Sequence, residues 1–277
     1  MIIQDNNKNI RYNDVHKNDI DFLKNYYALN GKFPLFKHVL IETRTDCNNR
    51  CPFCPQSHYN KEVGIMSWDC YTAIISQLCD IDFNGRVALM LSNEPLLEER
   101  LIKMISYAKS ASQRFFLDIT TNGKLLTTKL LDDLFKAGLD NININDYRSD
   151  RDKNDILSPN IEDVYSHYGD NPKVTIKKRR TDEVLPNYAG IIKQEFDSSV
   201  YGFCNYPFRK MTIAYTGDIL LCCDDFSYKT NFGNIMHDKL IDCWNNAQLN
   251  HIRKALLDNQ RIGICANCND IQDYKVF

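Results

Sequence analysis

Strand and helix patterns alternate through the middle of the chain, and this alternation restricts the fold more than any other feature of the sequence. Short apolar strand patterns occupy residues 38–44, 86–92, 115–121, 141–145 and 174–178. Helical patterns lie between several of them, over residues 68–79, 97–110 and 127–137. Strands joined by helices run parallel in one sheet. Five strands are too few for a closed eight-stranded barrel, so we predict a partial, open α/β barrel.

The ends of the chain depart from this alternation. Residues 18–30 place apolar groups at helical spacing and predict a short helix before the main domain. Strand patterns at residues 211–215 and 219–223 flank the turn Thr216-Gly217-Asp218, so we predict a β-hairpin there. Residues 238–257 then predict one long amphipathic helix. The predicted divisions are an N-terminal extension (1–37), the partial barrel (38–190) and a small α+β domain (191–277).

The composition is that of an ordinary globular protein without strong charge. Hydrophobic residues make up 43% of the chain, charged residues 25%, and the formal net charge is −2. This charge argues against broad electrostatic binding to nucleic acid or to an anionic membrane. No apolar run reaches the length of about 18 residues that a membrane span needs, and residues 1–13 lack the apolar stretch of a secretion signal. We therefore expect a cytoplasmic protein without nucleic-acid or membrane partners.

Cysteine is unusually frequent, with 11 residues in a chain of 277. The cytoplasm keeps thiols reduced, so a cysteine-rich protein in that compartment holds metal more often than disulfides. The odd number also fits a set of disulfides poorly. Metal binding is therefore the first hypothesis for these cysteines.

Three cysteines follow the first predicted strand in the pattern C-x3-C-x2-C: Cys47, Cys51 and Cys54. Three thiolates so close together can hold three irons of a [4Fe–4S] cluster and leave the fourth iron open to a small molecule. A structural zinc ion is the alternative; it needs four ligands, and His58 could supply the fourth. The position of the motif at the carboxyl end of a strand favours the cluster.

The motif resembles the signature of the radical S-adenosylmethionine (SAM) superfamily, in which an aromatic residue, here Phe53, precedes the last cysteine. Ser92-Asn93-Glu94-Pro95 ends the second strand where that family has Gly-Gly-Glu-Pro, and Glu94 keeps the carboxylate that meets the SAM amino group. Thr121-Asn122-Gly123 ends the third strand as in many relatives, although Asn-Gly alone also indicates a turn. The resemblance implies SAM contacts from six residues: Phe53, Ser92, Asn93, Glu94, Thr121 and Asn122.

The resemblance also implies a reaction type. In that family, SAM binds the open iron through its amino and carboxylate groups. An electron from the cluster cleaves SAM to methionine and a 5′-deoxyadenosyl radical, which removes hydrogen from the substrate. The expected cofactors are therefore a [4Fe–4S] cluster and SAM, and the expected partner is a low-potential electron donor such as ferredoxin or flavodoxin.

Four further candidate ligands lie near the C-terminus: Cys204, Cys222, Cys265 and Cys268. Four thiolates would saturate a second [4Fe–4S] cluster and make it an electron carrier, but they would equally hold a structural zinc ion. Their surroundings resemble the SPASM and twitch domains of many radical SAM enzymes, which implies an auxiliary cluster. The small number of cysteines implies the shorter twitch form with one such cluster. Gly217-x4-Cys222 has the family spacing and favours Cys222 over the adjacent Cys223 as the ligand.

The layout most resembles the radical SAM dehydrogenases that act on aminocyclitols. That resemblance implies an oxidoreductase of carbohydrate biosynthesis. Its substrate would be a small polyhydroxylated compound (a sugar, nucleotide sugar or cyclitol), in which an alcohol becomes a ketone while the auxiliary cluster accepts an electron. A radical SAM peptide maturase, a sugar epimerase or decarboxylase, and a zinc-stabilised binding protein are the alternatives.

Two segments supply candidate catalytic or substrate-binding residues. Relatives often have Asn-Arg-Ala-Gly shortly before the first auxiliary cysteine, and this chain has Asn187-Tyr188-Ala189-Gly190. Tyr188 could donate a hydrogen bond, act as a base, or simply pack as an aromatic ring. The basic run 177–180 follows the last barrel strand. Arg179 or Arg180 could bind the SAM carboxylate or a substrate phosphate, although such runs more often form a solvated surface.

Overall fold

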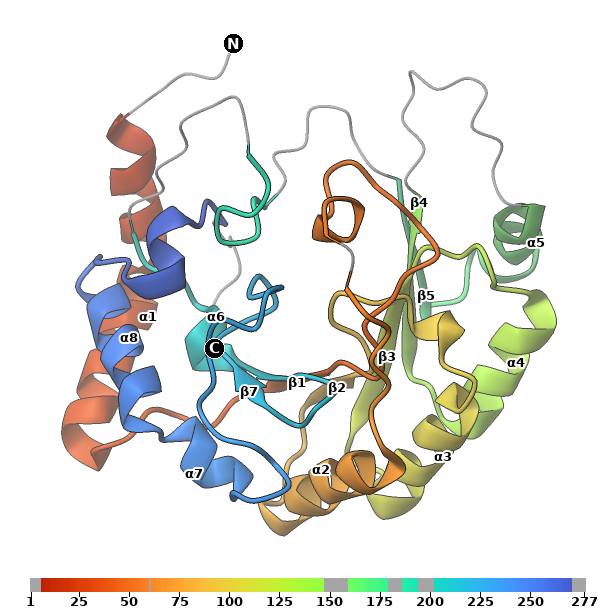
Figure 1. Ribbon diagram of the computed structural model, residues 1–277, viewed down its shortest axis with the longest axis horizontal. Coiled ribbons are helices and arrows are strands. Elements are labelled where there is room, and N and C mark those ends of the chain that lie inside the picture. Colours follow the sequence, from red (N-terminus) through yellow and green to blue (C-terminus); the bar gives the residue numbers. More distant parts are fainter. Residues whose placement is uncertain (1–5, 60, 147–158, 179–185, 194–201, 271–277) are drawn as a thin grey trace.

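The protein is built on one curved sheet. The computed structural model describes residues 6–59, 61–146, 159–178, 186–193 and 202–270. Within these residues, seven strands form a single sheet in the order β5-β4-β3-β2-β1-β6-β7 (Figure 1). The strands are β1 (His38–Ile41), β2 (Arg86–Ala88), β3 (Phe116–Thr121), β4 (Asn141–Asp146), β5 (Val174–Lys178), β6 (Lys210–Ile213) and β7 (Ile219–Leu220).

The first five strands are the barrel strands expected from the sequence. Strands β1 to β5 pair in sequence order, and each of these pairs is parallel. The sheet does not close, because β5 and β7 remain its two edges. The prediction of a partial, open α/β barrel is therefore confirmed. All five strands end on the same side, which is where parallel α/β sheets carry their sites.

Helices cover the outside of the sheet. Figure 1 shows α2, α3, α4 and α5 along its convex face. The α-helices are α1 (Asn6–Asn30), α2 (Trp68–Asp80), α3 (Leu101–Ala111), α4 (Thr128–Ala137), α5 (Pro159–Tyr168), α6 (Tyr206–Arg209), α7 (Leu240–Trp244) and α8 (Ala247–Leu257). Three short 3-10 helices are η1 (Pro55–Ser57), η2 (Pro95–Leu97) and η3 (Gly263–Asn267). Within the described part of the chain, no helix is both long and apolar enough to span a membrane.

Capping residues explain where the barrel helices begin and end. At the start of α2, Ser67 is the N-cap, and its Oγ accepts a hydrogen bond from Cys70 N at 3.1 Å. Thr127 Oγ1 accepts one from Leu130 N at 3.1 Å at the start of α4. Helix α4 ends at Gly138, whose φ of 108° lies in the left-handed region that glycine tolerates best.

The apolar core fills the space between the sheet and these helices. Val87, Leu117 and Ile142 on three neighbouring strands are fully buried. Ile74 of α2 and Met104 of α3 pack in the same cluster. Burial of one such side chain stabilises the fold by about 1.5–3 kcal/mol. These apolar residues pack in the core between the sheet and the helices. The polar residues at the strand ends are not part of this core and can form a site.

The C-terminal region extends the same sheet. Strands β6 and β7 form the predicted hairpin, with Thr212 opposite Leu220 in antiparallel register. Strand β6 also pairs in parallel with β1, so that Ile213 lies opposite Ile41. The hairpin is therefore a continuation of the barrel sheet and brings the C-terminal cysteine segment beside the first strand.

The prediction of one helix over residues 238–257 is wrong, because two helices, α7 and α8, occupy this segment. Asn246 lies between them, and its Oδ1 accepts hydrogen bonds from Gln248 N at 2.8 Å and Leu249 N at 3.3 Å. Asparagine at this position caps a new helix instead of continuing the old one. The break allows α7 to contact α2, where Leu240 N donates to Gln77 Oε1 at 2.6 Å.

A second apolar cluster joins the N-terminal helix to the C-terminal one. Helix α1, which is longer than the predicted helix over residues 18–30, lies beside α8 (Figure 1). Leu23 of α1 packs with Phe208 and with Leu256 of α8. The first and last helices are thereby fixed to each other next to the cysteine-rich C-terminal loops.

Arg253 is fully buried between these elements. Its Nε donates to Pro207 O at 2.7 Å, and its Nη1 donates to Trp244 O at 2.6 Å and Asn250 Oδ1 at 2.8 Å. Its guanidinium carbon lies 3.8 Å from the centre of the Trp244 ring. Burial lowers the Arg253 pKa to about 9, so the surrounding acceptors are what keep this charge tolerable.

We predict that Arg253→Met lowers the free energy of unfolding by about 3 kcal/mol, because three buried acceptors lose their donor. The matched control is Lys254→Met, which removes the exposed neighbouring charge on the same helix. Urea unfolding of both variants measures the effect, and the control should change stability by no more than about 0.5 kcal/mol. Equal stability of the two variants would contradict a structural role for Arg253.

Candidate active site

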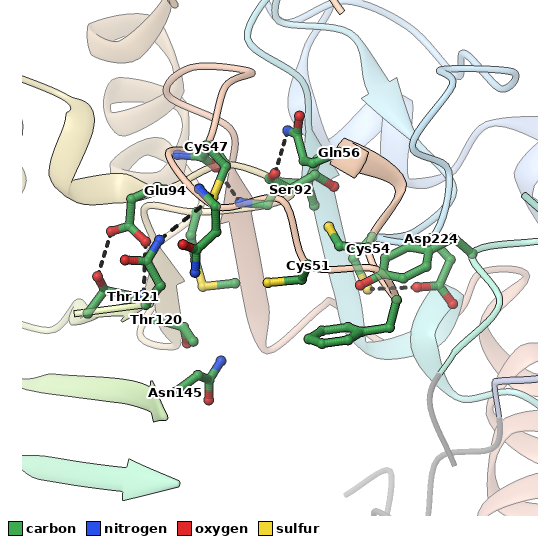
Figure 2. A pocket seen from close by; sticks show the side chains of 18 residues that line it. Cys47, Cys51, Cys54, Gln56, Ser92, Glu94, Thr120, Thr121, Asn145 and Asp224 are labelled. Atoms are coloured by element: carbon green, nitrogen blue, oxygen red, sulfur yellow. Dashed lines mark hydrogen bonds between the residues drawn. The ribbon is translucent and has the colours of Figure 1, made fainter. Parts of the chain in front are cut away.

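The first cysteine loop follows β1 and is fixed to two strand ends. Cys54 N donates to Cys51 O at 2.9 Å, which tightens the turn between these two cysteines. Gln56 Nε2 then bridges Thr45 O at 2.6 Å and Ser92 O at 2.8 Å. The glutamine thus holds the loop against the ends of the first and second strands. All three predicted ligands of the C-x3-C-x2-C motif line one cavity (Figure 2).

Glu94 supplies a fixed carboxylate beside this loop. The residue is 2% exposed. Its oxygens accept hydrogen bonds from Thr121 Oγ1 at 2.5 Å, Asn122 N at 2.8 Å and Leu96 N at 3.1 Å. Burial raises the pKa of Glu94, and these hydrogen bonds to the carboxylate oppose that rise. A positively charged group that enters the cavity would favour the ionised form and bind to it.

Asn122 connects the third strand to the cysteine loop. Its Nδ2 donates to Asn48 Oδ1 at 2.8 Å and lies 3.7 Å from Cys47 Sγ. On the second strand, Asn93 Oδ1 accepts a hydrogen bond from Leu91 N at 2.9 Å, which orders the segment before Glu94. The structure therefore brings together the six predicted SAM contacts, which all line the cavity: Phe53, Ser92, Asn93, Glu94, Thr121 and Asn122.

The cavity has a volume of about 280 Å³ and draws its walls from both ends of the sequence. One side consists of the first cysteine loop and the ends of β2 and β3. The opposite side includes Tyr188, Cys223 and Asp224 from the C-terminal half. Figure 2 shows Glu94 and Thr121 on one side and Asp224 on the other, with Cys51 and Cys54 between them.

The four predicted auxiliary ligands gather behind this second wall. Cys222 is partly buried, and its thiol interacts electrostatically with Cys265 and Cys204. Burial raises the pKa of Cys204, Cys265 and Cys268 to about 12 each. Thiolates, which are the form that ligates iron, therefore need a nearby positive charge at this place. A metal centre held by these thiolates would supply that charge.

The spacing of these thiols bears on the kind of metal. A tetrahedral zinc site needs its sulfurs about 2.3 Å from one ion. Among the described residues, no three His, Cys, Asp or Glu side chains form a group that could hold a single metal ion. Four thiolates saturate a [4Fe–4S] cluster, and the three neighbouring thiolates of the first cysteine loop leave one iron of such a cluster open.

Asp224 lies between the cavity and the auxiliary cysteines and was not predicted. It lines the cavity, is 3% exposed, and accepts from Cys268 Sγ at 3.7 Å and Cys223 Sγ at 3.9 Å. Its place directly after Cys222-Cys223 was the signal that could have identified it. Gln56 and Asn145 also line the cavity without having been predicted, and no motif marks them.

Tyr188 lies on a short arch that is tied to the auxiliary loop. Asn187 N donates to Asn269 Oδ1 at 2.7 Å, and Asn187 Nδ2 donates to Asn267 O at 2.8 Å. Tyr188 and Ala189 have φ values of 50° and 54°, which are strained for residues other than glycine. The arch thus places Tyr188 in the wall of the cavity at the expense of backbone strain. Arg179 and Arg180, the other candidates, lie outside the described residues.

Two family models match the chain. The model of the radical SAM superfamily matches residues 41–158. The model of SPASM, an iron–sulfur cluster-binding domain, matches residues 204–269. The first match includes the C-x3-C-x2-C loop and the Glu94 and Asn122 segments, and the second includes all four C-terminal cysteines.

Individual relatives extend these matches over most of the chain. The S-adenosyl-L-methionine-dependent 2-deoxy-scyllo-inosamine dehydrogenase of Niallia circulans is 28% identical over 242 residues, which cover 86% of this chain and 94% of that protein. The crystal structure of BtrN in complex with AdoMet and 2-DOIA has a TM-score of 0.76 at 28% identity and covers 87% of this chain and 99% of that one. A Pyrococcus furiosus protein that modifies the cofactor of tungsten-containing aldehyde ferredoxin oxidoreductase is 32% identical over 110 residues, covering 38% of this chain and 29% of that protein.

We predict that Glu94→Gln weakens SAM binding about thirtyfold, because a charge-assisted hydrogen bond to an ammonium contributes about 2 kcal/mol. The amide would also turn a donor toward Thr121 or Asn122, where the carboxylate now accepts. Equilibrium dialysis of SAM against the anaerobically reconstituted protein measures the dissociation constant. The matched control is Glu99→Gln, an exposed glutamate near the same segment. If both variants bind SAM like the original protein, Glu94 is not its ammonium ligand.

Proposed function

We propose an activity for this chain from the premise that it contains a radical SAM domain and a C-terminal SPASM domain. It binds SAM beside Cys47, Cys51 and Cys54 and oxidises an alcohol of a small polyhydroxylated compound to a ketone. The observation that carries this proposal is the cavity whose two walls come from the two cysteine regions. A substrate between these walls would be in reach of both.

The residues present fit two [4Fe–4S] clusters. Cys47, Cys51 and Cys54 would hold the first. The second would be held by a fully thiolate set: Cys204, Cys222, Cys265 and Cys268. When bound, the first cluster supplies the electron that cleaves the SAM sulfonium, and the second takes up an electron released by the substrate. The substrate alcohol loses one carbon-bound hydrogen atom to the 5′-deoxyadenosyl radical, one hydroxyl proton and one electron, and it becomes a ketone.

The side chains of the cavity orient SAM on one side and the substrate on the other. Glu94 binds the SAM ammonium, while Asn122 holds Cys47 and its loop in place. Tyr188 and Asp224 face the substrate from the C-terminal wall. Both can hydrogen-bond to hydroxyl groups and hold the reacting carbon in place. Tyr188 stands where relatives often have an arginine. The contact between this residue and the substrate therefore differs from that in the relatives.

The charges of the cavity support a small neutral or aminated substrate. Among its described lining residues there are two carboxylates, Glu94 and Asp224, and neither lysine nor arginine. A nucleotide-linked sugar would need cations for its phosphates. Hydroxyl and ammonium groups instead match carboxylate and amide acceptors. The name of the Niallia circulans relative, an inosamine dehydrogenase, supports the same class.

We also propose an external electron donor and a reducing compartment. SAM cleavage consumes one electron per turnover unless the electron taken up by the second cluster returns. A ferredoxin or flavodoxin would supply it. The described cysteines are all free thiols, which fits a cytoplasmic location.

We predict that, with SAM and a low-potential reductant, small cyclitols or aminocyclitols increase 5′-deoxyadenosine formation by about tenfold over SAM alone. Deuterium placed on the oxidised carbon should appear in 5′-deoxyadenosine, because that hydrogen moves to the radical. Mass spectrometry measures the amount of 5′-deoxyadenosine, its deuterium content and the amount of ketone. We expect about one ketone per 5′-deoxyadenosine. Nucleotide sugars and short peptides are the controls. Stimulation by a peptide alone, with cyclitols inert, would contradict the proposal and favour a peptide maturase.

A further inference from the structure

A lysine with a buried ammonium group connects the first cysteine loop to the segment that follows Cys222 and Cys223. We use the name Lys61 cage for Lys61, Glu42, Phe226 and Tyr228. Glu42 directly follows β1, and Lys61 lies between the first cysteine loop and α2. Phe226 and Tyr228 follow Asp224 closely in the sequence. Three separate segments therefore meet in this cage.

The Lys61 ammonium is held by aromatic faces. Its Nζ lies 3.8 Å from the centre of the Phe226 ring and 3.7 Å from the centre of the Tyr228 ring. The Nζ is buried, and no acceptor among the described residues hydrogen-bonds to it. A cation between two rings is attracted by both, and the attraction is strongest where water is excluded. The rings thus replace the water that the ammonium has lost.

Glu42 supplies the opposite charge from the end of β1. The residue is fully buried, and its Oε2 accepts hydrogen bonds from the Tyr228 hydroxyl and from Tyr215 N at 3.4 Å. Its Oε1 has no hydrogen-bond partner among the described residues. Burial raises the pKa of Glu42 and lowers that of Lys61, and the charge of each opposes the shift of the other. Loss of the Lys61 charge would leave the buried Glu42 carboxylate without this cation. Loss of the Glu42 charge would leave Asp225 as the carboxylate that still interacts electrostatically with Lys61.

The cage is continuous with both walls of the cavity. Thr45, two residues before Cys47, donates from Oγ1 to Glu62 O at 2.9 Å and accepts from Gly64 N at 2.9 Å, so the Lys61 segment is fastened to the first cysteine loop. On the other side, Asp225 lies between Asp224 and Phe226. Its carboxylate accepts from Lys229 N at 2.8 Å and Thr230 N at 2.9 Å and makes this turn rigid.

We propose that the Lys61 cage is a positioning device that fixes the Cys223–Asp224 wall relative to the first cysteine loop. Lys61, Glu42 and Tyr228 are positioning residues and do not line the cavity. Their contribution is to keep the substrate in reach of both sides of the site at once. The expected effect on ketone formation rests on the proposed function. The expected effect on the position of the Cys223–Asp224 wall does not.

The test compares Lys61→Met with Lys103→Met in the anaerobically reconstituted protein. Lys103 is an exposed lysine whose Nζ lies 4.2 Å from the Trp68 ring centre, so it is a matched lysine–aromatic contact outside the site. In Lys61→Met, amide hydrogen exchange over residues 222–230 should become about tenfold faster or more, while exchange in α2 stays unchanged. Ketone formed per 5′-deoxyadenosine should fall about tenfold, with SAM affinity unchanged, because a small misplacement of substrate costs rate steeply. Lys103→Met should change none of these.

Two further variants keep the test decisive. Lys61→Arg retains a cation that stacks on aromatic rings. Its amide exchange over residues 222–230 and its ketone yield should therefore stay close to those of the original protein. Tyr228→Phe retains the ring but removes the hydroxyl that donates a hydrogen bond to Glu42. It should therefore show a smaller increase in exchange over residues 222–230 and a smaller loss of ketone. This variant replaces Lys61→Met in the test if Lys61→Met does not fold. Unchanged exchange over residues 222–230 in Lys61→Met, or in Tyr228→Phe in its place, would overturn the proposal. If the original protein forms no ketone, the proposed function is refuted. The exchange measurement would still show whether the Lys61 cage fixes residues 222–230.

Discussion

The parallel pairing of β1 with β6 is the constraint on which the site depends. Ile41 lies opposite Ile213, and Glu42 N donates to Ile213 O at 2.9 Å. Strand β1 leads into the first cysteine loop, and β6 leads through the hairpin to Cys222 and Asp224. Because parallel strands present their carboxyl ends on the same side, this one pairing places two cysteine segments around one cavity. The helical cluster of α1 and α8 then holds the C-terminal segment in that place.

Much of this architecture could be predicted from the sequence. The alternating strand and helix patterns of the sequence located most of the barrel. Helix α5 was missed, because its ten residues have few apolar positions to reveal a period. The break at Asn246 was missed because the apolar spacing continues across it, while a single side-chain oxygen starts a new helix there.

The site was predicted where ligand chemistry has a fixed spacing, and missed where only the fold brings residues together. The three thiols of the first cysteine loop and Glu94 belong to short motifs, and all four residues line one cavity. Gln56 and Asn145 line the cavity because of strand order and loop path, and the sequence has no local pattern for them. Asp224 had only its place directly after Cys222-Cys223 as a signal. The β1–β6 pairing joins residues about 170 positions apart, and one chain without an alignment holds no signal for such a contact.

Burial gives the two cysteine regions their common electrostatic character. Burial raises thiol pKa values in both, and it also raises the pKa of the Glu94 and Asp224 carboxyl groups. The thiolate and carboxylate forms of these groups are therefore unfavourable unless positive charge enters the cavity, through iron, through the SAM ammonium and sulfonium, or through a cationic substrate. The structure is therefore arranged for cofactors that are not part of the chain.

The most direct test of this account is the iron and sulfide content per chain after anaerobic reconstitution. It should be measured in the original protein and in a variant with Cys47, Cys51 and Cys54 all changed to Ala. The account predicts about eight irons in the first and about four in the second, because the auxiliary cysteines would keep their own [4Fe–4S] cluster. Equal iron in both proteins would mean that the first loop holds no cluster and would contradict the central claim.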